Sequence, residues 1–270
     1  MGLLKTYIVP HPPIIIPEIG EGKEKQAQKI LDAYHAIAEE IAAMDVDTVI
    51  VSSPHAPMYR DYFRISSGHA GWGSFERFGA PHVYFDIPYD MPLIQDLHES
   101  LAVHGIKGGS LERDNPPLDH GCMVPLYFLK KHMDSFNMIR LSITEEPLST
   151  HYELGKAVAK IVNDSDRRVV WLASGDLSHK LKKDGPYGYA KEGETFDESL
   201  LEALKKANFE AFFNYDDDFL KAAAQCGLES FTMMAGALDG RKVKTDFHAY
   251  ERPFGVGYAI VGYTPVDEDG

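Results

Sequence analysis

Three strand-like runs in this chain each end in a short turn that contains proline or glycine and carries a histidine. The runs are rich in β-branched and other apolar residues and span positions 4–9, 48–51 and 169–172. The histidines that follow them are His11, His55 and His179. In an open α/β sheet, ligand-binding and catalytic groups gather outside the carboxyl ends of the strands. We therefore expect these three side chains to meet at one edge of a sheet.

Amphipathic helical segments alternate with the apolar strands along the chain. Apolar residues recur at helical spacing over residues 21–44, and the strand at 47–52 then completes a βαβ unit. Near-continuous apolar strands suit a parallel sheet that is covered on both faces. We predict one α/β domain over residues 1–270, with a mostly parallel central sheet flanked by helices on both faces. Residues 242–248 and 257–261 are expected to close it as an antiparallel pair.

The stretch from 58 to 89 departs from this alternation. Residues 62–66 and 82–86 have the composition of strands, and several glycines separate them. We expect a loop-rich excursion over one rim of the sheet. Such excursions commonly supply the walls of substrate pockets.

Composition excludes several classes of function. The 270 residues carry a formal net charge of −14, which disfavours binding to nucleic acid or to an anionic membrane surface. No stretch is long and apolar enough to span a membrane. Prolines interrupt the N-terminal apolar run, so we do not expect it to be a signal peptide. The two cysteines, Cys122 and Cys226, are far apart and form no CxxC pattern, so a reducing, cytoplasmic setting is expected.

The three histidines, together with a glutamate, suggest a metal site. Glu229 lies at the start of a predicted helix, and prolines stiffen the turns around His11 and His55. Two histidines and one carboxylate with open coordination positions are typical of non-haem Fe(II) oxygenases. Each histidine taken alone is better explained as an ordinary hydrogen-bonded loop residue, and only their common placement favours a metal. Cys226 is a further candidate ligand, because a thiolate binds metals well. The alternative is that it is a small buried apolar residue with no role at the site.

Five short motifs carry a resemblance to a known family. They are Pro10-His11-Pro12, Ser53-Pro54-His55-Ala56, Leu118-Asp119-His120-Gly121, Gly175-Asp176-Leu177-Ser178-His179 and Gly227-Leu228-Glu229-Ser230. In content and order they resemble the class III extradiol ring-cleavage dioxygenases, of the type found in the beta chain of protocatechuate 4,5-dioxygenase, over nearly the whole chain. The resemblance implies that His11, His55 and Glu229 bind Fe(II), with Zn²⁺ able to replace it during purification. It also implies that His179 is the acid/base residue and that His120 contacts the substrate.

The activity implied by the resemblance is the opening of a catechol or 2-aminophenol type ring with O₂. The expected partners are therefore a small aromatic substrate and dioxygen, and whether the chain forms a homo-oligomer is left open. Two alternatives remain open as well. One is a different metal-dependent enzyme on the same scaffold, for example a zinc hydrolase. The other is a Memo-type protein, since that branch of the superfamily places a cysteine among the metal-site residues, as Cys226 would be.

Overall fold

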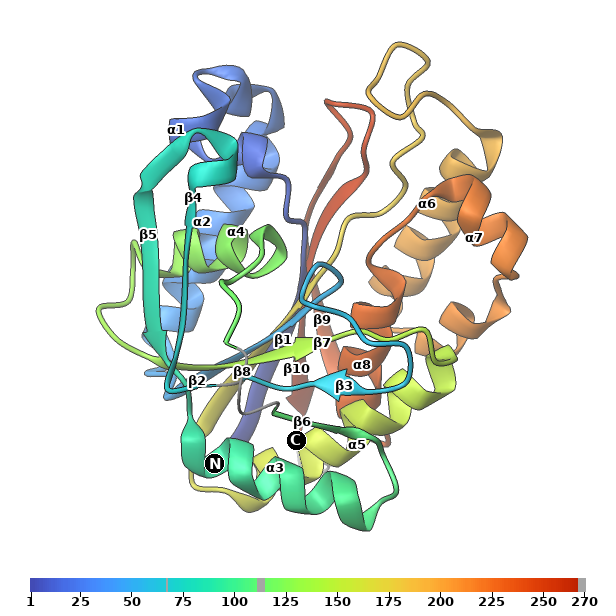
Figure 1. The fold of residues 1–270 in the computed structure, drawn as a ribbon. Helices are drawn as coiled ribbons and strands as arrows, with labels where there is room; N and C mark the ends of the chain where they lie inside the picture. The colour runs from blue at the N-terminus through green and yellow to red at the C-terminus, as the bar shows by residue number, and fades with distance from the viewer. Residues whose placement is uncertain (67, 111–114, 267–270) are drawn as a thin grey trace.

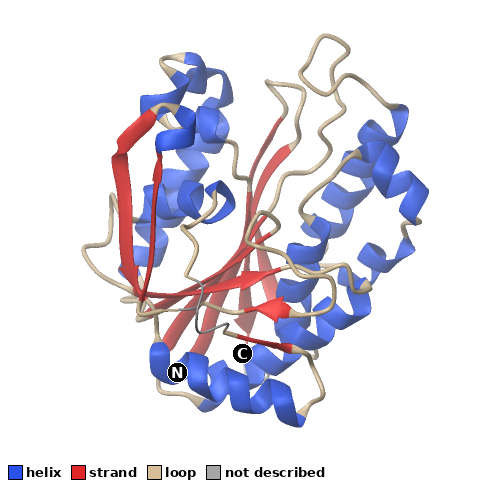
Figure 2. Cartoon of the chain, in the orientation of Figure 1, coloured by secondary structure: helices blue, strands red, loops and turns tan. Residues whose placement is uncertain are grey.

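The computed structural model describes residues 1–66, 68–110 and 115–266, and a six-stranded sheet lies at its centre (Figures 1 and 2). The strand order is β7-β2-β8-β1-β10-β9. The first four strands in this order are mutually parallel, and β10 and β9 pair antiparallel at one edge. The strand bounds are β1 Gly2–Val9, β2 Thr48–Ser53, β7 Asn137–Ser142, β8 Arg168–Ser174, β9 Lys242–Glu251 and β10 Tyr258–Val266. The predicted α/β class and the antiparallel closing pair are confirmed, and the sheet as a whole is mixed.

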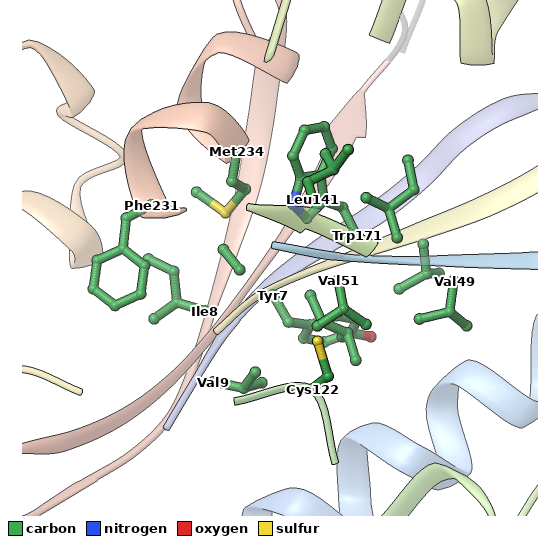
Figure 3. Close-up of a cluster of buried hydrophobic side chains, with 14 of the residues drawn as sticks. Tyr7, Ile8, Val9, Val49, Val51, Cys122, Leu141, Trp171, Phe231 and Met234 are labelled. Carbon is green, nitrogen blue, oxygen red and sulfur yellow. The ribbon is translucent and has the colours of Figure 1, made fainter. Parts of the chain in front are cut away.

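Helices cover both faces of the sheet. Figure 3 shows Phe231 and Met234 of α8 on one side of the central strands and Cys122 of α4 on the other. On the α8 side, α5 packs closely against α8. Glycine at 155 permits this contact, since a side-chain Cβ there would lie only 1.9 Å from the Met233 carbonyl oxygen. The helix bounds are α1 Pro17–Gly20, α2 Gln28–Ala43, α3 Met91–Val103, α4 His120–Leu129, α5 Leu148–Asp164, α6 Lys191–Lys205, α7 Asp217–Ala223 and α8 Leu228–Ala237.

The first long helix begins later than its periodicity predicts. Residues Lys23–Ala27 form a 3₁₀ segment, and the α-helix starts only at Gln28. Glu21 and Gly22 both have positive φ angles, of 49° and 99°. A left-handed backbone cannot continue a right-handed helix, so the chain turns before α2 forms.

The register of the parallel strands sets the position of the turns that follow them. In the pairing of β1 with β8, Val9 lies opposite Ser174, and β2 continues this register on the other side of β8. The three strands therefore end at one level on the carboxyl edge of the sheet. His11, His55 and Asp176 each lie two residues beyond that level. The parallel pairing thus brings these three side chains to the same place.

The excursion between β2 and α3 is more ordered than predicted. Its main feature is a hairpin of β4 (Ala70–Phe75) and β5 (Ala80–Pro88), joined by the 3₁₀ segment Glu76–Phe78. Outside the hairpin, the two-residue strands β3 (Phe63–Arg64) and β6 (Gly108–Gly109) pair in parallel.

Strand β4 is not predicted by the sequence pattern, because glycines at 71 and 73 suggest a loop. Both glycines face closely packed neighbours. A Cβ at Gly73 would lie 3.2 Å from the backbone of Leu118, and one at Gly71 would lie 3.0 Å from the Leu118 side chain. Glycine in β4 therefore permits close contact with the segment that leads into α4.

A buried carboxyl group anchors the turn that carries His179. Asp197 of α6 is 2% exposed and accepts hydrogen bonds from the Ser178 backbone N–H, at 2.8 Å, and from the Tyr250 hydroxyl, at 2.6 Å. Burial raises the pKa of Asp197 to about 6, an effect that these two hydrogen bonds and the charge of Arg252 oppose. Residues from α6 and β9 thus fix the residue next to His179.

The raised pKa of Asp197 makes a prediction about stability. The folded state holds the proton more tightly than the unfolded chain, so this group contributes stability at low pH that is lost as the pH rises from about 4 to about 6. Asp197→Asn has no carboxyl group to titrate at this position. Over this pH range its free energy of unfolding should therefore fall by up to about 3 kcal/mol less than that of the unmodified chain. Denaturant unfolding at pH 4, 5 and 6 measures it, with exposed Asp184→Asn as the control. Parallel pH profiles for Asp197→Asn and the unmodified chain would contradict the assignment.

Candidate metal centre

His11 and His55 meet at the carboxyl edge of the sheet. The two Nε2 atoms are 3.0 Å apart, and the His11 ring is buried. His11 Nδ1 lies 2.9 Å from the hydroxyl of Ser174, which itself donates to the Gly121 carbonyl at 2.6 Å. Because the hydroxyl hydrogen is used in that bond, Ser174 accepts from Nδ1–H, and Nε2 of His11 keeps its lone pair. An imidazole held through one nitrogen in this way is oriented to bind a metal through the other.

The sulfur of Cys226 completes a group of donor atoms around these rings. Its Sγ lies 3.6 Å from Nε2 of His11, and the donors of His11, His55 and Cys226 lie within 4.8 Å of one another. A second such group consists of Asp176, His179 and Cys226. The two groups share the sulfur atom, so five potential ligands gather in one region. Imidazole nitrogen and thiolate sulfur are donors that zinc and iron favour.

Glu229, the predicted third ligand, lies outside both donor groups. It is in the first turn of α8, and its carboxylate accepts a hydrogen bond from Gln225 Nε2 at 3.4 Å. Burial raises its pKa. Cys226 precedes the helix, which begins at Leu228, so helical spacing does not place the two side chains on one face. The structure therefore brings His11 and His55 together with a sulfur donor, and places the carboxylate outside this set.

The two histidines predicted to act on the substrate border the donor groups. His120 opens α4 and stacks on His55, with ring centroids 4.2 Å apart. His179 donates from Nδ1 to the Ala224 carbonyl at 2.6 Å, which leaves its Nε2 free, 3.7 Å from Asp176 Oδ2. Both predicted residues thus lie beside the candidate metal ligands.

Asp176 belongs to this site, although the sequence pattern assigns it no role beyond its motif. Its Oδ1 accepts a hydrogen bond from the backbone N–H of His11 at 2.9 Å, which joins the turns after β1 and β8. Burial raises the pKa of Asp176 to about 7. The sequence pattern gives no signal for this role, because the predicted strand ends at residue 172, and only the observed end of β8 at Ser174 places Asp176 as far beyond its strand as His11 lies beyond β1.

The histidines of this centre are held neutral. Burial lowers the pKa of His11 well below its ordinary value, and repulsion from His55, His120 and His179 adds to the effect. The same causes, burial first and then His55, lower the pKa of His120 to about 4. Neutral imidazoles present the lone pairs that a metal requires. The donor chemistry and the close approach of the two Nε2 atoms therefore fit a divalent transition metal.

Comparison with known proteins shows the family of this chain. The profile of one family, described as the catalytic LigB subunit of aromatic ring-opening dioxygenase, matches residues 5–261. The chain belongs to this family. The match contains every residue of the candidate metal centre, and the resemblance predicted from the motifs is confirmed.

Individual relatives fall into more than one group. Protein CA_C1420 of Clostridium acetobutylicum is 37% identical over 97% of this chain, which spans only 57% of that protein's length. The 2-aminophenol 1,6-dioxygenase beta subunit of a Pseudomonas species is 24% identical over 98% of this chain and 94% of its own. A MEMO1 family protein of Methanocaldococcus jannaschii, MJ0403, is 23% identical over 84% of this chain and 75% of its own.

Similarity also extends to a solved structure. The crystal structure of uncharacterized protein JW3007 from Escherichia coli K12 matches with a TM-score of 0.68 at 16% identity, over 96% of this chain and 99% of that one. This likeness shows a shared fold. Within the described residues, no helix is both long enough and apolar enough to cross a membrane.

The arrangement of donors predicts which side chain binds the metal with the two histidines. Cys226→Ala should lower metal affinity by more than the roughly 10–100-fold that follows loss of a supporting hydrogen bond, because a ligand itself is removed. Glu229→Gln should retain the metal. Metal stoichiometry after dialysis against a weak chelator measures both, with Cys122→Ala as the control for removing a thiol elsewhere. Metal loss in Glu229→Gln together with retention in Cys226→Ala would instead assign the carboxylate as the ligand.

Proposed function

We propose that this chain is a metal-dependent extradiol dioxygenase that opens the ring of a catechol or 2-aminophenol type substrate with O₂. The proposal rests chiefly on one observation: the donors of His11, His55 and Cys226 converge, and two further histidines lie beside them. LigB family membership supports the reaction class, and the similarity to a 2-aminophenol 1,6-dioxygenase beta subunit supports the substrate class.

Fe(II) is the proposed metal, held by His11, His55 and Cys226, with Glu229 as the alternative third ligand. Iron bound there would supply open coordination positions for the substrate heteroatoms and dioxygen, and the redox chemistry that dioxygen requires. Zn²⁺ can occupy the same donors after purification, since its affinity for such sites exceeds that of Fe²⁺. The protein side chains must then supply proton transfer and substrate orientation.

His179 is the proposed acid/base group. Its Nδ1 donates to the Ala224 carbonyl, so its Nε2 is the nitrogen available to accept a proton from a substrate hydroxyl or amino group. The Asp176 carboxyl lies 3.7 Å from that nitrogen, and in its ionised form it would stabilise the resulting imidazolium. The same nitrogen can return the proton when the ring opens. The lowered pKa of His179, caused mainly by burial, favours the neutral form needed for the first step.

His120 is proposed to contact the substrate. Burial and the neighbouring His55 keep its imidazole neutral, and its ring continues the stack that begins at the ligand His55. A neutral imidazole offers one donor and one acceptor nitrogen. It can therefore hold a substrate heteroatom without adding a charge to the centre.

The two cysteines and one relative bear on the proposed setting and assembly. Cys122 and Cys226 are both free thiols, which fits a reducing cytoplasm. Because one relative is named as a beta subunit, we extend the proposal to assembly with a second copy or with a companion subunit.

A second candidate function is supported by the sulfur donor. A site of two histidines and one cysteine also suits Zn²⁺, as in a hydrolytic enzyme, and the similarity to a MEMO1 family protein fits a Memo-like role on the same scaffold. Oxygen consumption coupled to ring opening separates these alternatives from the dioxygenase, because hydrolysis needs no O₂ and the Memo-like role includes no ring opening.

The dioxygenase proposal predicts oxygen uptake by the iron-loaded chain with catechol or 2-aminophenol. His179→Ala should reduce turnover by about 10²- to 10⁴-fold and retain the metal, because it removes proton transfer and leaves the proposed ligands in place. An oxygen electrode combined with metal analysis measures both effects, and exposed His82→Ala is the control. If the fully iron-loaded chain consumes no oxygen with either ring, the zinc or Memo-like alternative is favoured. If His179→Ala loses its metal, His179 is a ligand.

A further inference from the structure

Two solvent-exposed aromatic side chains touch the two histidines that border the donor groups. Phe78 ends the 3₁₀ turn of the β4–β5 hairpin and is 38% exposed, and Tyr187 lies between β8 and α6 and is 57% exposed. The ring of Phe78 lies 5.6 Å from that of His120, at 68°. The ring of Tyr187 lies 5.0 Å from that of His179, at 81°. Both contacts are edge-to-face.

These two aromatic residues reach the centre from separate parts of the chain. Figure 1 shows the β4–β5 hairpin on one side of the carboxyl edge of the sheet and the segment that leads into α6 on the other. On the hairpin side, Phe78 contacts His120, which stacks on His55. On the other side, Tyr187 contacts His179, which shares a donor group with Cys226. Each aromatic ring is therefore one histidine away from the proposed metal ligands.

Their exposure shows that the two rings have surface available for a ligand. Half of the 30 aromatic side chains in this protein are buried, among them Phe75 and Phe85 of the same hairpin. Besides His120, the Phe78 ring contacts Phe75, at a centroid distance of 6.2 Å. Aromatic rings associate favourably in edge-to-face or offset geometry, beyond the gain from buried area. A planar ring bound at the donors would gain such contacts from both sides.

We propose that Phe78 and Tyr187 form an aromatic clamp that selects planar ring ligands over other chelators with the same pair of donor atoms. This inference rests on the proposed function and assigns two residues that determine its specificity for aromatic rings. The substrate is a single aromatic ring whose two adjacent heteroatoms face the metal donors and whose ring contacts Phe78 and Tyr187. A non-aromatic chelator can bind the metal through the same pair of donor atoms, but it makes no aromatic contact with Phe78 or Tyr187.

The test compares two chelators on the zinc-loaded protein, in which zinc prevents turnover. The aromatic probe is 4-nitrocatechol, followed by its absorption spectrum, and the non-aromatic probe is acetohydroxamate, followed by competition. Phe78→Ala and Tyr187→Ala should each weaken 4-nitrocatechol binding by about 2- to 12-fold. Acetohydroxamate affinity should remain within about twofold, and Tyr187→Phe should restore the binding of 4-nitrocatechol.

Matched controls come from exposed aromatic residues of the same two segments. Tyr84, on β5, is 53% exposed and Tyr189 is 42% exposed. Tyr84→Ala and Tyr189→Ala should leave the affinities for both chelators unchanged. Zinc content is measured in every variant, so that loss of metal is not read as loss of the clamp.

The possible failures are distinguishable. If Phe78→Ala and Tyr187→Ala leave 4-nitrocatechol binding unchanged, or weaken both chelators equally, the clamp is refuted while the metal centre stands. If neither chelator binds the zinc-loaded unmodified chain, the proposed function fails, and the clamp fails with it.

Discussion

The candidate site depends on the parallel register of β1 and β2 against β8. This pairing ends the three strands at one level and places His11, His55 and Asp176 two residues beyond it. The hydrogen bond from the His11 backbone to the Asp176 carboxyl, at 2.9 Å, then ties two of the turns together. A slip of one residue would turn every side chain of a strand to the opposite face of the sheet. Because both faces of the central strands are packed with apolar side chains, such a slip is strongly disfavoured (Figure 3).

The protein around the centre controls protonation as well as position. Ser174 and the Ala224 carbonyl each hold Nδ1 of one histidine, and so leave Nε2 of His11 and of His179 directed toward the donor groups. Burial and the mutual repulsion of the rings keep these imidazoles uncharged. Crowding four histidines into one region is unfavourable unless they are neutral, and neutrality is what metal binding requires. The same crowding therefore serves both ligation and proton transfer.

Much of the architecture can be predicted from local pattern. Apolar strands followed by turns that carry His11, His55 and His179 indicate both the sheet and the edge where these residues gather, and the parallel pairing agrees. The hairpin strand β4 cannot be predicted in this way, because its glycines serve a tertiary contact with Leu118 that no local pattern reveals.

The set of metal donors is harder to predict than the fold. Cys226 and Glu229 lie three residues apart, and which of them faces the histidines depends on where α8 begins. Sequence periodicity does not define a helix start to within one residue. Asp176 escapes prediction because its importance comes from pairing with another strand, which a single sequence does not display.

We propose that a metal binds at the carboxyl edge of the sheet through two histidines and a cysteine. X-ray absorption spectroscopy of the zinc-reconstituted full chain tests it directly. One sulfur neighbour is expected at about 2.3 Å and nitrogen or oxygen neighbours at about 2.0–2.1 Å, with the sulfur signal absent in Cys226→Ala. A zinc environment composed only of nitrogen and oxygen in the unmodified chain would contradict it.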